Sequence, residues 1–167
     1  MEKIMKEIHP NIFIGNDTDC AKCINDLEFA IVHACKTCHQ TALNYTKSLP
    51  PSHQNYLIFE SGQHLYLNLV DMTQEFQPKY THPIFDRTMD FINEQLPERK
   101  VLIHCNQGLS RSTSIGLVYL ARHGIIANDD LESAATEFIK LYPDYQPGNG
   151  VKLYTKNNWD YLMRWNS

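Results

Sequence analysis

The chain has 167 residues, 43% of them hydrophobic, a length and composition that suit one globular domain with its own core. Its formal net charge of -4 provides no basic field for nucleic-acid phosphates, so a polynucleotide partner is not expected. The start, MEKIMKEIHP, lacks the apolar stretch of a signal peptide, and no apolar run reaches membrane-spanning length. We therefore expect a cytoplasmic protein without membrane insertion.

The first third of the chain predicts two strands and a helix. NIFIG (11–15) has the pattern of a short strand, and Asp17 would cap the short helix that follows. FAIVHA (29–34) is an apolar, β-branched run that suits a buried strand. The segment SLPPSHQN (48–55) is rich in turn residues and predicts a surface connection within the domain.

A hairpin and a long helix are predicted next. YLIFE (56–60) and HLYLNLV (64–70) flank Ser61-Gly62, which favours two strands joined by a tight turn. The segment 81–97 has apolar residues at helical spacing, with Thr81 as its cap and Pro97 as its end.

Strands and helices continue to alternate toward the C-terminus. KVLIH (100–104) predicts a buried strand, and 110–124 predicts a helix that ends at Gly124. Asp129 and Glu132 form the capping-box pattern of a further helix, and one last helix is predicted over 148–165. This order predicts an α/β fold in which helices flank a sheet with a parallel core.

The loop HCNQGLSRS (104–112) lies where the buried strand 100–104 meets the following helix. In open α/β sheets ligands bind at the carboxyl ends of strands, and a helix N-terminus there offers free N–H groups to an anion. Gly108 permits a turn of the backbone amides toward a phosphate, and the planar fork of Arg111 can hold two phosphate oxygens. A helix N-terminus and an arginine also stabilise a thiolate, so Cys105 is the predicted nucleophile.

These residues resemble the signature loop of the cysteine-dependent protein tyrosine phosphatases, and the small chain is most similar to their dual-specificity branch. The resemblance implies a phosphatase-like sheet in a single catalytic domain over residues 1–167, and a phosphocysteine intermediate that needs no metal or other cofactor. Ser112 would stabilise the Cys105 sulfur, and His104 would order the loop. The phosphate-binding residues would be Asn106, Gln107, Gly108, Leu109, Ser110 and Arg111.

The resemblance also implies an aspartate acid about thirty residues before the cysteine. Asp71 stands 34 positions earlier, at the end of a predicted strand, and is the expected general acid and later general base. Glu75 is the alternative on the same loop, and a purely structural role for Asp71 stays open. Asp86 and Asp90 fall inside the predicted helix and are expected on its solvated face.

The uncharged side chains of Asn106, Gln107 and Leu109 indicate how many phosphate groups the substrate carries. Family members that act on polyphosphorylated lipids carry lysines inside this loop, so the resemblance implies a single phosphate on tyrosine, and on serine or threonine, of a protein or peptide. Two alternatives stay open: a phosphatase of a small-molecule or lipid monoester, and a non-catalytic phosphate-binding module.

Four further cysteines form two Cys-x-x-Cys pairs, Cys20 with Cys23 and Cys35 with Cys38. Such pairs can bind zinc, although packing in the core is the simpler interpretation. The stretch CKTCH also matches a haem-attachment pattern, which nothing else in the chain supports. A third alternative is redox control, in which Cys35 or Cys38 forms a disulfide with an oxidised Cys105.

Overall fold

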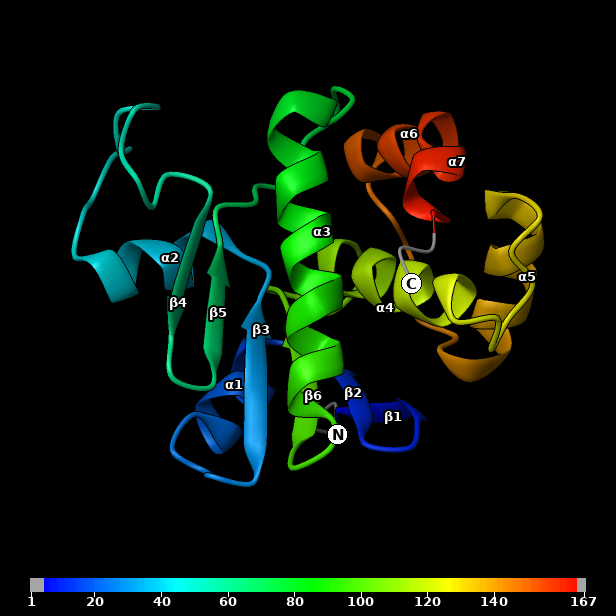
Figure 1. Cartoon of the computed structure of the whole chain (residues 1–167), viewed down its shortest axis with the longest axis horizontal. Helices are drawn as coiled ribbons and strands as arrows, with labels where there is room; N and C mark the ends of the chain where they lie inside the picture. Colours follow the sequence, from blue (N-terminus) through cyan, green and yellow to red (C-terminus); the bar gives the residue numbers. More distant parts are fainter. Residues whose placement is uncertain (1–4, 165–167) are drawn as a thin grey trace.

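The computed structural model describes residues 5–164 and shows a six-stranded sheet with helices on both faces (Figure 1). The strand order is β1-β2-β6-β3-β5-β4. Strands β2, β6, β3 and β5 run parallel, whereas β1 and β4 pair antiparallel at the two edges. The predicted α/β class, with a parallel core flanked by helices in one small domain, is therefore confirmed.

The elements follow the predicted alternation of strand and helix. The strands are β1 Lys6–His9, β2 Ile12–Gly15, β3 Phe29–His33, β4 Ile58–Ser61, β5 His64–Leu67 and β6 Lys100–His104. The helices are α1 Asp17–Cys23, α2 Lys36–Leu43, α3 Pro78–Gln95, α4 Arg111–Arg122, α5 Leu131–Leu141, α6 Asn149–Asn157 and α7 Trp159–Leu162. In Figure 1, α3 crosses in front of the strands, and α4 to α7 lie together at one side.

Alternation of side chains along the central strands separates two apolar layers. Val32 of β3 and Ile103 of β6 belong to the main core, which also contains buried residues of α3, α4, α5 and α6. Ile31 and Leu102 point to the other face and pack with Cys23 of α1. His33 and His104 end their strands in register with each other, so the same alternation directs both rings toward the α1 face.

Three predicted N-caps were wrong by one to four residues. The N-cap of α1 is Asn16, whose side chain and Asp19 form a capping box, and Asp17 is already helical. The N-cap of α3 is Gln77, four residues before Thr81, and the helix begins at Pro78 because proline suits the first helical position. Asp130 caps α5 by accepting from the Ser133 amide, so the box of Asp129 with Glu132 is not formed.

Some elements were not predicted, and one prediction merged two helices. β1 is an exposed edge strand, and α2 is a short helix whose weak apolar pattern gave no signal. The predicted last helix is divided at Asn158 into α6 and α7, and its final residue 165 lies outside the described residues. Over residues 5–164, no helix is long and apolar enough to cross a membrane.

Candidate active site

The loop 104–112 lies between central strand β6 and helix α4, as predicted. Cys105 is only 2% exposed. Gly108 has a φ of 72°, and a Cβ there would overlap the backbone carbonyl of Gly15, so both its conformation and its surroundings require glycine. The Gly108 carbonyl accepts a hydrogen bond of 2.8 Å from the Tyr142 hydroxyl. The loop is therefore held from β2 and from the end of α5.

The thiol of Cys105 faces the start of α4. Its Sγ lies 3.1 Å from the hydroxyl oxygen of Ser112. Arg111, 9% exposed, donates to the Leu69 carbonyl at 2.9 Å and to the Asn106 side-chain oxygen at 2.8 Å. Its Nε is buried and has no hydrogen-bond partner among the described residues. A guanidinium anchored at two atoms, with an N–H left over, is arranged to hold an anion.

Asp71 is brought to the same loop by a relay through Ser110. The Ser110 hydroxyl donates to Asp71 Oδ1 at 3.2 Å and accepts from the Gly148 amide at 2.7 Å. A Cβ on Gly148 would overlap the Asp71 carboxylate, so the glycine makes room for this side chain. Asp71 is exposed and can meet a substrate from solvent.

A single pocket contains most of the predicted site residues. Asp71, Cys105, Asn106, Gln107, Leu109, Ser110 and Arg111 line it, together with Gln146 and Gly148. His104, Gly108 and Ser112 belong to the same loop but are buried and do not line the pocket. Gln146 and Gly148 were missed because their segment, QPGNG, showed only a turn signal in the sequence.

The other carboxylates that the sequence offered lie elsewhere. Glu75 accepts a hydrogen bond from Asn157 and lines a different pocket. Asp86 and Asp90 lie within α3, as expected, and Asp86 accepts from the Tyr161 hydroxyl. Among these candidates, Asp71 is the carboxylate that lines the pocket of Cys105.

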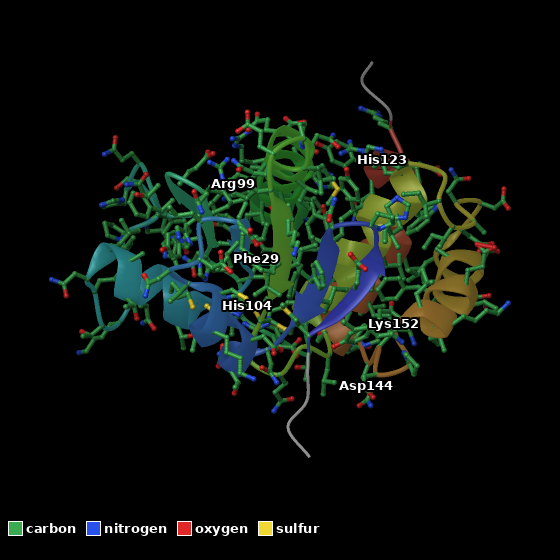
Figure 2. All side chains as sticks on the ribbon, turned by 90° about the horizontal axis from the view of Figure 1, so that it is seen from below. Phe29, Arg99, His104, His123, Asp144 and Lys152 are labelled. Carbon is green, nitrogen blue, oxygen red and sulfur yellow. The ribbon has the colours of Figure 1, made fainter. Side chains whose placement is uncertain are left out.

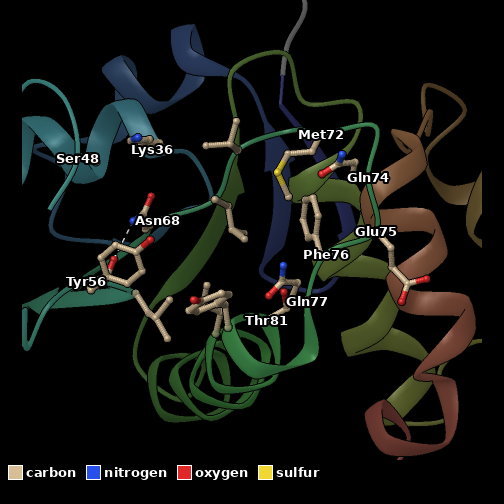
Figure 3. A pocket seen from close by; sticks show the side chains of 15 residues that line it. Lys36, Ser48, Tyr56, Asn68, Met72, Gln74, Glu75, Phe76, Gln77 and Thr81 are labelled. Carbon is tan, nitrogen blue, oxygen red and sulfur yellow. Dashed lines mark hydrogen bonds between the residues drawn. The ribbon is translucent and has the colours of Figure 1, made fainter. Parts of the chain in front are cut away.

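A second pocket lies across the loop that carries Asp71 (Figure 3). Figure 3 shows Met72, Phe76 and Gln77 on one side of this pocket and Tyr56 with Asn68 on the other. The amide of Asn68 donates to the Tyr56 carbonyl at 2.8 Å. Leu69, Val70 and Met72 line this pocket, whereas Asp71 lines the pocket of Cys105, so their loop lies between the two cavities.

Behind the signature loop, His104 belongs to a buried polar cluster. His104 Nε2 lies 2.8 Å from His33 Nδ1 and 3.9 Å from Cys38 Sγ, and His33 Nδ1 lies 3.6 Å from Cys20 Sγ. Figure 2 shows His104 beside the blue and cyan helices α1 and α2. Burial, with the neighbouring His104 and His64, lowers the pKa of His33 to about 2, which keeps the ring neutral.

The two Cys-x-x-Cys pairs do not meet as a set of four cysteines in the described chain. Cys20 faces His33, whereas Cys23 packs in the second apolar cluster and contacts the Met5 sulfur at 4.0 Å. Cys35 occupies the N-cap position of α2 without a side-chain capping bond, and a hydrogen bond with Cys38 raises the pKa of its thiol. A disulfide between Cys105 and Cys35 or Cys38 stays a prediction.

Comparisons with known proteins identify the class of proteins whose fold this chain shares. No protein-family model matches it. A relative from Dictyostelium discoideum, described as a probable dual specificity protein phosphatase, is 27% identical over 129 residues, which are 66% of this chain and 32% of the relative. The chain therefore spans about a third of the length of that curated relative.

Several solved structures share the architecture over almost the whole chain. DUSP15 matches with 20% identity and a TM-score of 0.63, covering 96% of this chain and 92% of its own. The human tyrosine phosphatase-like serine/threonine/tyrosine-interacting protein matches with 19% identity and a TM-score of 0.64, covering 96% and 98%. A leucine rich repeat and phosphatase domain containing protein from Entamoeba histolytica matches with 15% identity and a TM-score of 0.65, covering 98% and 95%. The fold is that of the dual-specificity phosphatases.

Proposed function

We propose, from the premise that the chain has the dual-specificity phosphatase fold, that it is a cysteine-dependent protein phosphatase with one catalytic domain over residues 1–167. It hydrolyses phosphotyrosine and also phosphoserine or phosphothreonine. The observation that carries the proposal is one pocket that Cys105, Arg111 and Asp71 line together. A nucleophile, an oxyanion clamp and an acid are the groups that phosphate-ester cleavage needs.

The first chemical step transfers the phosphoryl group to the enzyme. The thiolate of Cys105 attacks phosphorus, and the sulfur–phosphorus bond forms while the bond from phosphorus to the ester oxygen breaks. Asp71 gives its proton to the departing oxygen, which leaves as the free hydroxyl of the substrate side chain. Arg111 and the amides of residues 106–111 hold the phosphoryl oxygens, and the unpartnered Nε of Arg111 supports this role.

The second step releases phosphate. Asp71, now ionised, takes a proton from a water molecule that attacks phosphorus, and the sulfur–phosphorus bond breaks. The Ser112 hydroxyl, 3.1 Å from Sγ, donates to the departing thiolate and stabilises it. His104 orders the loop from below, where its Nδ1 lies 3.3 Å from the Cys105 carbonyl oxygen.

Replacing Arg111 by lysine is expected to lower kcat/KM by about 10²-fold, because lysine keeps the charge but loses the planar fork that grips two oxygens. The same change removes the bonds from Arg111 to Leu69 and to Asn106, so thermal unfolding of the variant must be measured beside its kinetics. An Arg111→Lys chain that keeps wild-type kcat/KM on a phosphopeptide would contradict the clamp.

Replacing Gly148 by alanine tests the position of Asp71 without altering its chemistry. The new methyl group would displace the carboxylate, and a misplacement of this kind costs about 10²-fold in kcat. Gly148 has a φ of -64°, which alanine adopts without strain, so the fold should be kept. The effect is expected on phosphopeptides and should be small on aryl phosphates whose leaving group needs no proton; equal losses on both would argue against Asp71 as the acid.

The proposed substrate class rests on the uncharged side chains of the loop. Asn106, Gln107 and Leu109 line the pocket and add no cation, which suits a single phosphate rather than a polyphosphorylated headgroup. We propose a phosphoprotein or phosphopeptide partner and a cytoplasmic location, where the five free cysteines stay reduced. Assays with phosphotyrosine and phosphothreonine peptides, in chelator and reductant, test this. No turnover of either peptide by folded protein would instead favour a small-molecule phosphate or a non-catalytic binding module.

A further inference from the structure

Four sulfur and nitrogen atoms converge behind the signature loop, and no step of the proposed reaction uses them together. They are Cys20 Sγ of α1, His33 Nδ1 of β3, Cys38 Sγ of α2 and His104 Nε2 of β6, and all lie within 4.8 Å of one another. Cys20, His33 and His104 are buried, and Cys38 is partly exposed. The cluster joins two strands to the two helices that cover their carboxyl ends.

The distances within the cluster suit a tetrahedral metal ion. In a zinc site with bonds of about 2.0–2.3 Å, neighbouring ligand atoms lie about 3.3–3.8 Å apart. The separation of Cys20 Sγ from His33 Nδ1 is 3.6 Å, and that of Cys38 Sγ from His104 Nε2 is 3.9 Å. The two histidine nitrogens are closer, at 2.8 Å, so they must part by about half an ångström to reach a common ion.

The second nitrogen of each ring already has the partner that a ligating histidine needs. His33 Nε2 lies 3.0 Å from His64 Nδ1, and His104 Nδ1 lies 3.3 Å from the Cys105 carbonyl oxygen. Metal-binding histidines place their proton on the nitrogen away from the ion and donate it to such a group. Both rings can therefore turn a lone pair toward the centre of the cluster while their N–H groups stay satisfied.

We propose that Cys20, His33, Cys38 and His104 form a structural site for a divalent zinc-class ion. Two thiolates and two imidazoles are a donor set typical of closed, four-coordinate zinc sites. On binding, each thiol releases its proton to solvent, and the proton between the two rings moves to the outer nitrogen of the ring that carried it. Both inner nitrogens are then free to bind, and two metal–sulfur and two metal–nitrogen bonds form. The ion links α1 and α2 to β3 and β6, directly beneath the loop that carries Cys105.

A competing set shares one ligand with this site. Asp17, Cys35 and His104 also place their ligand atoms within 4.8 Å of one another. That set has three members, and the Asp17 side chain is 54% exposed and lies 3.7 Å from His104 Nδ1, the nitrogen that faces the Cys105 carbonyl. The four-membered set is favoured because it is more deeply buried and uses Nε2 of His104.

The experiment is a titration with Co²⁺, whose absorption bands report tetrahedral geometry and thiolate ligation. It uses the full chain carrying Cys105→Ser, without a polyhistidine tag, so that the nucleophile cannot add a further thiolate. The expected result is one tightly held Co²⁺ per chain with tetrahedral and thiolate-to-metal bands, displaced by Zn²⁺. Zn²⁺ at about 100 times its Kd should raise the Tm by about 5–10 °C.

Matched variants in the same background assign the ligands. Cys20→Ala and Cys38→Ala should each weaken Co²⁺ binding by more than about 100-fold, and His64→Ala, which removes a supporting contact, by about 10-fold. Cys23→Ala is the control, since this thiol lies in the same helix as Cys20 but packs elsewhere. Cys38 is partly exposed, so Cys38→Ala should still fold. Its Co²⁺ binding can therefore be measured even if Cys20→Ala fails to fold.

Three results would overturn the proposal. The first is the absence of tetrahedral Co²⁺ bands from the folded, reduced chain. The second is equal weakening of binding by Cys23→Ala and Cys38→Ala. The third is loss of binding in Cys35→Ala while Cys20→Ala keeps it, which would assign the ion to the competing set. Metal content rather than turnover is read in each case, so the outcome is independent of the proposed catalysis.

Discussion

A Cys105→Ser chain is expected to lose at least about 10⁴-fold in kcat on a phosphotyrosine peptide, because removing a covalent nucleophile abolishes the chemical route that the rest of the site serves. Serine is nearly isosteric with cysteine, and its oxygen can keep the contact with Ser112. At neutral pH, however, a hydroxyl is far less ionised than a thiol, so neither attack nor departure of the side chain is effective. Steady-state kinetics with both peptides, in reductant and chelator, provide the measurement.

Cys23→Ala is the matched control for this loss. Cys23 is a buried free thiol, like Cys105, but it packs in the second apolar cluster on the α1 face. Its substitution should leave kcat unchanged within about twofold, apart from a modest loss of stability typical of a small core truncation. Retention of turnover by folded Cys105→Ser would show that another group attacks the phosphate.

Asp71→Asn is expected to lower kcat on phosphopeptides by about 10³-fold, within the range typical of general acid–base catalysis. Asparagine keeps the shape of the side chain and can accept the Ser110 hydrogen bond, but it has no proton of suitable acidity to give to the leaving oxygen. The loss should shrink as the leaving group becomes more acidic, and it should be small for an activated aryl phosphate.

Glu75→Gln is the control for Asp71→Asn. Glu75 lies on the same loop but lines the neighbouring pocket, so the kcat of Glu75→Gln on the same phosphopeptides should stay at the wild-type value. A loss in Glu75→Gln as large as that in Asp71→Asn, or a loss in Asp71→Asn that does not depend on the leaving group, would contradict the assignment of the acid.

The core of the site was predictable because its residues are contiguous. HCNQGLSRS carries the nucleophile, the turn glycine and the arginine in nine neighbouring positions, and the apolar run before it fixes a buried strand. Asp71 is further away, and the resemblance to a family supplied its spacing. Gln146 and Gly148 could not be found in this way, because only the folded chain brings their turn to the mouth of the pocket.

Predicted helix starts were wrong where more than one nearby residue was suited to begin the helix. Asn16 and Asp17 are both good N-caps, as are Asp129 and Asp130, and the sequence does not decide which one leaves the helix. At α3, a proline at the first position prevailed over the hydroxyl of Thr81. These differences shift an element end without altering the order of strands in the sheet.

The cysteines show what local spacing cannot reveal. The Cys-x-x-Cys pattern grouped Cys20 with Cys23, yet helix α1 directs the first toward His33 and the second into an apolar cluster. The cluster of Cys20 and Cys38 with two histidines depends on the register of β3 against β6, which pairs His33 with His104. Strand register across a sheet is a tertiary property, so the spacing of the cysteines could not reveal this cluster.

The most direct test of the central claim is detection of the covalent intermediate. The Asp71→Asn chain is mixed with an activated aryl phosphate, which still transfers its phosphoryl group, and the reaction is quenched in acid and digested for mass spectrometry. One added phosphoryl group is expected on the peptide that contains Cys105, and none on that peptide in a Cys105→Ser, Asp71→Asn chain. Turnover by the wild type, with no phosphoryl group found on Cys105 at any quench time, would contradict a phosphocysteine route.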